Sequence, residues 1–201
     1  MLNGTRGAEK LQQHRIVEHA LPPLIEMGSQ GTSLTLLYYV SYGLHIVSSD
    51  LDLHSMLHSS HAAPTLIRIV EQCTAQGVQL GDQLNPLPAR QTEKKTVQQA
   101  EEQFSLSRRA ILHACHALLA LASNPNLREH LAEGDRLERI LQLCLRSNPA
   151  YTDEIHDSLL QTILELATHG NFPFSDRQIS IVTVLTSWGY GRGDMYVSYE
   201  I

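Results

Sequence analysis

Internal repetition is the feature of this sequence that most restricts its fold. A set of apolar residues and one arginine recurs further along the chain at nearly constant spacing. The earlier members are Leu44, Leu53, Leu57, Leu66, Arg68, Ile69 and Cys73, and the later ones are Leu118, Leu127, Leu131, Leu137, Arg139, Ile140 and Cys144. The spacing is 74 residues for the first three pairs and 71 for the other four, so one connecting turn is shorter in the second copy. A repeated unit of this size predicts stacked copies that bury one another's apolar faces.

The repeating unit is predicted to be helical. Leu137, Ile140, Leu141 and Cys144 follow one another at steps of three, one and three residues, which places them on one helix face. A third, weaker copy places Leu166 at 45 residues beyond Leu121. Strand patterns are nearly absent before residue 195, so the sequence predicts an all-α fold.

Residues that begin and end helices punctuate the units. Side chains able to cap helix starts are Ser33, Asp50, Ser105 and Asp153, and residues that stop or turn helices are Pro125, Gly134 and Gly170. The predicted long helices span residues 33–48, 105–123 and 153–168. Turns between two shorter helices are predicted within 16–27, 56–70 and 130–141.

This organisation resembles the armadillo repeat family. A unit of that family has a short first helix, a second helix introduced by a small-residue turn and often a proline, and a long third helix that lines a concave groove. The resemblance implies a right-handed α-solenoid of three full units and a partial one. It divides the chain into a tail at 1–8, a repeat domain at 9–188 with units at 9–49, 50–123, 124–169 and 170–188, and a tail at 189–201.

One segment interrupts the second unit. Residues 77–104 precede its third helix, whereas the equivalent connection after Cys144 needs about eight residues to reach Asp153. The glycine, proline and polar content of 77–104 predicts a mobile loop. Such an insertion is either a tolerated surface loop or a binding element, because insertions in repeat arrays emerge on one face.

Composition restricts the partners and the compartment. The net charge of -6 argues against general affinity for the nucleic-acid backbone. The most apolar stretch, 34–47, is too short to span a membrane, and the first ten residues lack a signal-peptide core. Three widely spaced cysteines in apolar helical runs indicate a reducing compartment, so we expect an intracellular protein of the cytoplasm or nucleus.

Two histidine clusters are candidate chemical sites. His54, His58 and His61 have the i, i+4, i+7 spacing of metal ligands on a helix, but the predicted turn at 59–63 takes His61 off that face, so no metal site is predicted. His116 adjoins Cys115 and could activate it, yet Cys115 lies among apolar helical residues and is predicted to be a buried structural thiol.

No enzyme site is predicted. The glycine-rich run at 189–194 does not lie between a strand and a helix, so it lacks the context of a phosphate loop, and its Arg-Gly-Asp triplet is interpreted as coincidence. The sequence shows no paired carboxylates, nucleophile with base, or cofactor fingerprint. We expect neither catalysis nor a cofactor.

The armadillo register points one face of each third helix into the groove. The residues expected to bind a partner there are Tyr39, Tyr42, His113, His116, Ser158, Gln161 and Glu165. Nuclear-import members of the family grip basic peptides with a ladder of Trp and Asn, but the corresponding positions here are Tyr42, His116 and Gln161, then Ile46, Ala120 and Glu165. Recognition of that cargo is therefore not carried over.

The resemblance implies a protein-interaction scaffold, as part of a larger chain or a multi-subunit complex. The expected partner is a protein or peptide segment on the concave face, with no nucleic acid and no membrane. The alternative is a regulatory or exchange-factor module that clamps a folded client such as a chaperone or small GTPase. Exposed groove aromatics favour the first function, and a charged rim with a mobile insertion favours the second.

Overall fold

The computed structural model describes residues 3–84, 94–145 and 148–169. The predicted partial unit at 170–188 and the tail at 189–201 lie outside these residues, as do the first two residues of the predicted tail at 1–8.

The described residues are almost entirely helical, and they contain no β-strand. The elements are α1 (Asn3–Gln30), α2 (Leu34–Ser48), the 3-10 turn η1 (Leu51–Leu53), α3 (His54–Ser59), α4 (Ala62–Leu84), α5 (Lys94–Ser123), α6 (Pro125–Ala132), α7 (Arg136–Leu145) and α8 (Asp153–His169). The all-α prediction is confirmed. Among these helices, none is both long enough and apolar enough to cross a membrane.

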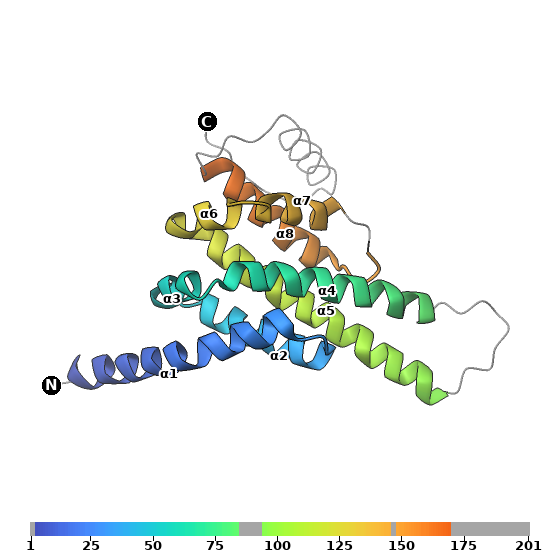
Figure 1. Cartoon of the computed structure of the whole chain (residues 1–201), viewed down its shortest axis with the longest axis horizontal. Coiled ribbons are helices and arrows are strands. Elements are labelled where there is room, and N and C mark those ends of the chain that lie inside the picture. The colour runs from blue at the N-terminus through green and yellow to red at the C-terminus, as the bar shows by residue number, and fades with distance from the viewer. Residues whose placement is uncertain (1–2, 85–93, 146–147, 170–201) are drawn as a thin grey trace.

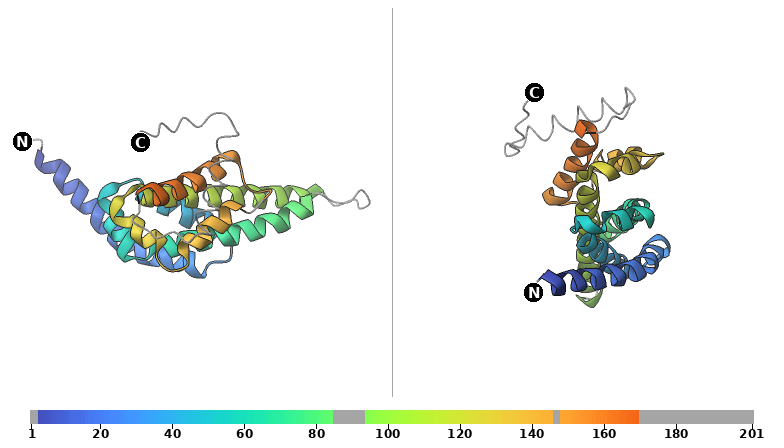
Figure 2. Two further views of the ribbon diagram at one scale, coloured as in Figure 1. Left: turned by 90° about the horizontal axis from the view of Figure 1, so that it is seen from above. Right: turned by 90° about the vertical axis from the view of Figure 1, so that its left-hand side faces the viewer.

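Helices from different parts of the chain lie side by side in rows. One row is α2, α5 and α8, a second is α1, α4 and α7, and the short helices α3 and α6 also contact each other. Figure 1 shows α5 crossing the middle of the molecule, and the right-hand view of Figure 2 shows successive tiers, with α1 and α2 at one end and α6 to α8 at the other. Helices predicted to be equivalent in successive units are therefore neighbours in space.

The core runs without a break through all the described units. It includes Leu44 and Leu118, which are fully buried, and the matched residues Leu57 and Leu131, which are each 1% exposed. Leu53 and Leu127 are each 7% exposed, so the predicted core positions at the start of α3 and α6 are confirmed.

Equivalent side chains cap η1 and α6. The Asp50 carboxylate accepts a hydrogen bond from the Asp52 backbone N–H at 3.0 Å, and the Asn124 side-chain oxygen accepts one from the Asn126 N–H at 3.0 Å. Asn124 follows Asp50 at the spacing of 74 residues that the leucines show. Both side chains satisfy a helix-start donor that would otherwise lack a partner.

A second pair of matched residues binds the end of the preceding long helix. The Nε2–H of His54 donates to the Ser48 carbonyl at 2.7 Å, and the Nε–H of Arg128 donates to the Ala122 carbonyl at 2.7 Å. These carbonyls are the last acceptors of α2 and α5, and cationic or N–H donors are favourable at helix C-termini. Each short helix is thereby tied to the long helix before it.

The matched arginines of α4 and α7 both contact the preceding helix of their row. Arg68 donates to the Gly28 carbonyl of α1 at 2.7 Å. Arg139 forms a two-pronged ion pair with Glu71 of α4, at 2.8 and 2.6 Å. The two arginines bind different kinds of acceptor, a backbone carbonyl and a carboxylate. In both cases the acceptor lies in the preceding helix of the row.

The turns before α4 and α7 both use a left-handed backbone. His61 has φ of 57° and Gly134 has φ of 65°. The predicted turn within 56–70 is confirmed by the end of α3 at Ser59 and the start of α4 at Ala62. The one within 130–141 is confirmed by the break between α6 and α7.

The predicted turn within 16–27 is wrong. Pro22 and Pro23 lie inside α1, which continues to Gln30. Each proline removes an N–H donor and costs an internal helix about 3 kcal/mol. Leu21 is buried, and Leu24 and Ile25 pack against the core, so side-chain burial keeps the segment helical.

The loop prediction for 77–104 is also wrong over the residues that the structure describes. α4 continues to Leu84 and α5 begins at Lys94, so Ser105 is inside a helix rather than at its start. A Cβ added at Gly77 would lie 2.8 Å from the Ala150 side chain, and one at Gly81 would lie 3.1 Å from Pro149. These glycines are helical residues that allow a close approach, not turn residues.

Leu131→Ala should lower the free energy of unfolding by about 2–5 kcal/mol, because it removes a buried side chain between units. Leu145→Ala, at a position that is 40% exposed, is the control and should cost much less. Urea denaturation measures both. Equal stability of the two variants would contradict the placement of Leu131 in the core.

Gly134→Ala should destabilise the protein by about 1–2 kcal/mol, because a Cβ is disfavoured in the left-handed region. No atom lies within 4 Å of the added Cβ, so conformational strain is the only structural cost. The converse change, His61→Gly, should be neutral or stabilising in the same urea titration. A stabilising Gly134→Ala substitution would show that this turn does not hold a left-handed residue in solution.

Candidate functional site

The residues predicted to bind a partner lie on one row of helices. Tyr39 and Tyr42 are on α2, His113 and His116 are on α5, and Ser158, Gln161 and Glu165 are on α8. The structure brings Tyr42 and His113 into contact. Tyr39 is connected to them through Tyr38, and His116 through His45. It does not bring the α8 residues into the same cluster.

The most exposed part of this row is an apolar stripe on α2. Tyr39 is 63% exposed, Tyr42 is 43% exposed and Ile46 is 53% exposed. Their spacing of three and four residues puts them on one helix face, which we call the α2 stripe. Large apolar side chains clustered on a surface are typical of binding sites, whereas isolated ones are common everywhere.

Neighbouring aromatic side chains pack against the tyrosines of the α2 stripe. The Tyr38 and Tyr42 rings stack with centroids 6.2 Å apart, and the Tyr42 ring meets the edge of His113 at 5.0 Å. Tyr38 also contacts Tyr39 at 5.1 Å, between ring centroids. These contacts restrict the rotamers of Tyr39 and Tyr42, so less side-chain entropy is lost when a partner covers them.

Three histidines form a cluster beside the stripe. The His45 ring lies 5.4 Å from that of His113 and 5.3 Å from that of His116. Burial is the main reason that the pKa values of His45 and His113 are lowered, and the neighbouring histidines lower them further. The Nδ1 atoms of His45 and His113 are buried without a hydrogen-bond partner among the described residues.

His116 connects the cluster to α8. Its Nε2 lies 3.5 Å from the Glu154 carboxylate, which is 62% exposed. An exposed pair at this distance contributes little to stability. Its position matters more, because it adds a negative charge at the edge of the histidine cluster.

Ser158 is not a surface residue, which corrects its prediction as a binding residue. It is 5% exposed, and its hydroxyl donates to the Glu154 carbonyl at 2.8 Å. The Thr162 hydroxyl donates in turn to the Ser158 carbonyl at 2.7 Å. Ser158 therefore faces the core side of α8, where a partner cannot reach it.

Glu165 forms an ion pair within the protein, whereas Gln161 is exposed. The Glu165 carboxylate accepts a hydrogen bond from the Arg128 guanidinium at 2.9 Å, and Arg128 also holds the end of α5. Glu165 thus has an internal structural partner. Gln161 is exposed, and it lies about two helical turns beyond Glu154 along α8.

The first histidine cluster has separate structural roles. His54 is buried and accepts a hydrogen bond at Nδ1 from the Asn124 side chain at 2.9 Å, while its Nε2–H binds Ser48. His61 sits in the left-handed turn after α3. Within the described ranges, no group of three or more histidine, cysteine, aspartate or glutamate side chains has a geometry that could hold a metal ion.

The cysteines are buried free thiols, as predicted. Burial raises the pKa of Cys73 and of Cys144 to about 12 in each case. The pKa of Cys115 is raised well above its usual value by burial and then by Cys144. Because the thiolate is the nucleophile, these shifts make the thiols unreactive despite the neighbouring His116.

Sequence reasoning missed Tyr38, His45 and Glu154, which complete the cluster. Tyr38 and His45 lie four residues before and three residues after Tyr42, so they share a helix face with it. That helical spacing is the feature of the sequence from which Tyr38 and His45 could have been predicted. Glu154 had no such signal, because its contact with His116 depends on how α5 and α8 pack.

Comparisons of this chain with protein-family models, with curated proteins and with solved structures find no match.

Acidification should destabilise the protein in part through His113. Its folded-state pKa is lowered below the unfolded value of about 6.5, so the unfolded chain binds the proton first and stability falls as the pH drops through and below that value. His45, His116 and Arg109 oppose protonation of His113, whereas Glu154 favours it. Melting temperatures between pH 7.5 and about pH 5.5 should therefore fall less in His113→Gln than in the wild type.

The melting temperatures at pH 8, where the histidines are neutral, measure the packing cost of the same substitution separately. An unchanged difference between wild type and His113→Gln across the whole pH range would contradict a role for His113 in the acid response.

Proposed function

We propose that this chain is a non-enzymatic protein-interaction module of armadillo type. Its partner binds on the surface formed by α2, α5 and α8, and the α2 stripe is the centre of that surface. The protein acts as a scaffold within a larger chain or complex, in the cytoplasm or nucleus.

The observation that carries the proposal is the exposure of the α2 stripe. More than half the surface of Tyr39 and of Ile46 is open to solvent, beside a Tyr42 ring that is already braced by Tyr38 and His113. Tyrosine is enriched at binding hot spots because it combines a large apolar ring with a hydrogen-bonding hydroxyl. The partner segment is therefore expected to present apolar side chains to this stripe.

The repeated contacts between units are a second support. His54 and Arg128 bind the ends of α2 and α5. The matched arginines of α4 and α7 bind α1 and α4. This repetition of contacts supports the proposal of a repeat array. Repeat arrays of this kind bind extended segments along the row of equivalent helices. The partner is accordingly proposed to run from α2 across α5 toward Gln161 of α8.

The alternative, a module that clamps a folded client, predicts a charged rim and a mobile insertion at 77–104. The described parts of that segment belong to α4 and α5, where Gly77 and Gly81 pack against the connection before α8. We therefore prefer the scaffold.

A Tyr39→Ala, Ile46→Ala double variant should weaken binding of a partner captured by pull-down at least about tenfold, because it removes the centre of the apolar surface. Both side chains are largely exposed, so the melting temperature should change little. Surface plasmon resonance with the purified partner measures the change.

Ile16→Ala with Val78→Ala is the matched control, because these exposed apolar residues lie on α1 and α4 in the other row. The control should keep full affinity. Full affinity in the α2 variant, or equal losses in both variants, would overturn the proposed surface.

A further inference from the structure

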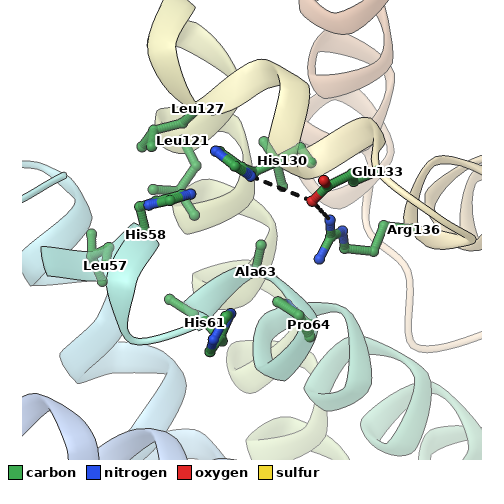
Figure 3. Close-up of a pocket in the computed structure, with 12 residues that line it drawn as sticks. Leu57, His58, His61, Ala63, Pro64, Leu121, Leu127, His130, Glu133 and Arg136 are labelled. Atoms are coloured by element: carbon green, nitrogen blue, oxygen red, sulfur yellow. Dashed lines mark hydrogen bonds and ion pairs between the residues drawn. The ribbon is translucent and has the colours of Figure 1, made fainter. Parts of the chain in front are cut away.

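A cavity of about 260 Å³ has no residue of α2 or α8 in its lining. Figure 3 shows its lining side chains converging from α3, the turn after it and the start of α4, from α5, and from α6, the turn after it and the start of α7. The cavity therefore forms where the equivalent short helices α3 and α6 meet.

The floor of the cavity is apolar and rigid. Leu57 and Leu131 are each 1% exposed, and Leu121 and Leu127 are 3% and 7% exposed, so the leucines that line the cavity belong to the core. Ala63 and Pro64 from the first turn of α4 complete the apolar part. An engineered apolar cavity of about 150 Å³ binds benzene, so a larger one can hold two fused rings or a ring with a short polar group.

The rim of the cavity is polar. Figure 3 shows His58, His130, Glu133 and Arg136 around the opening, with His61 across from them. The His58 and His130 rings lie 3.7 Å apart between centroids. Glu133 accepts from Arg136 at 2.7 Å and lies 3.4 Å from the Nδ1 of His130.

The charges of this rim favour an anion. Glu133 is its one carboxylate among the residues that line the cavity, and Arg136 already balances that charge. The other ionisable side chains of the lining are three histidines. Among the described residues the buried Nε of Arg136 has no hydrogen-bond partner, so the guanidinium has donor capacity beyond its contact with Glu133.

The neighbours of His58 shift its pKa. Burial first, and then the proximity of His130, His61 and Arg136, lower the pKa of His58, while Glu133 raises it. A second negative charge in the cavity would favour protonated histidine and would offset the repulsion between His58 and His130. A cationic ligand would instead meet only one carboxylate, which is already paired.

We propose that this cavity is a binding site for a small aromatic carboxylate. The ring lies on the leucine floor, and the carboxylate faces the Arg136 and His58–His130 side of the rim. A guanidinium that can donate to a carboxylate through two N–H groups gives such a site both affinity and orientation. The site is independent of the partner surface proposed for α2, α5 and α8.

The test uses three probes of one shape: 2-naphthoate, the neutral 2-naphthamide and the cationic 2-naphthylmethylamine. Isothermal titration calorimetry should give a dissociation constant for naphthoate on the order of 1 mM or lower. Naphthamide should bind about tenfold or more weakly, because it lacks the charge-assisted hydrogen bonds. Amide chemical shifts in a labelled sample should change around α3, α6 and the turn before α7.

Two variants, each with a matched control, test the contributions of the rim and of the apolar floor to binding. Arg136→Gln should reduce naphthoate affinity to that of naphthamide, while Arg109→Gln removes the same charge from α5 and should leave both affinities unchanged. Ala63→Leu fills the cavity and should abolish binding of both probes. Ala75→Leu adds the same group on an exposed face of α4 and should have no effect.

Equal affinity for naphthoate and naphthamide, or a preference for the amine, would overturn the carboxylate assignment. Binding retained in a folded Ala63→Leu variant, or no binding of any probe, would overturn the site itself. The Ala63→Leu and Ala75→Leu pair keeps the test decisive if Arg136→Gln fails to fold.

Discussion

The structure depends on the burial of one long helix, α5. Helices of every described unit contact it, namely α2, α4, α6 and α8, and its buried side chains include both small and large ones. Ala110, Ala114 and Ala117 are fully buried beside Ile111 and Leu118, so neighbouring backbones can approach α5 closely while branched side chains fill the space between them. A tightly packed interior of this kind tolerates little change of volume. The positions of the α2 stripe and of the cavity between α3 and α6 follow from how their helices pack on α5.

The repeated leucines and their spacing were enough to predict the order of helices in the second and third units, because the same residues recur on the same buried faces. Leu57 and Leu131 are the clearest case, since their matched positions have the same burial. Prediction failed where contacts between distant segments overrode local preferences. Proline at 22 and 23 indicates a break, but burial of Leu21 keeps α1 continuous. Glycine at 77 and 81 indicates a loop, but each lets α4 lie close to residues 149–150.

In the candidate site, too, local spacing predicted some positions, whereas others depended on contacts between distant segments. Tyr39 and Tyr42 could be placed from their spacing on one helix, and the structure puts both on the surface. Ser158 had an equally good spacing on α8, yet it is buried, because helical periodicity does not determine which way a whole helix is turned. The cavity could not have been predicted, because His58 and His130 are 72 positions apart and meet only when α3 packs against α6.

The contacts made by the matched polar residues also give the array a direction. His54, Arg68, Arg128 and Arg139 each donate to an acceptor in an earlier helix, and Arg128 also donates to Glu165 of the later helix α8. A chain synthesised from its N-terminus therefore presents the accepting carbonyls and carboxylate before the side chains that bind them emerge. Each completed unit can act as the template on which the next one docks, so assembly in the order of synthesis needs no rearrangement of what has already folded.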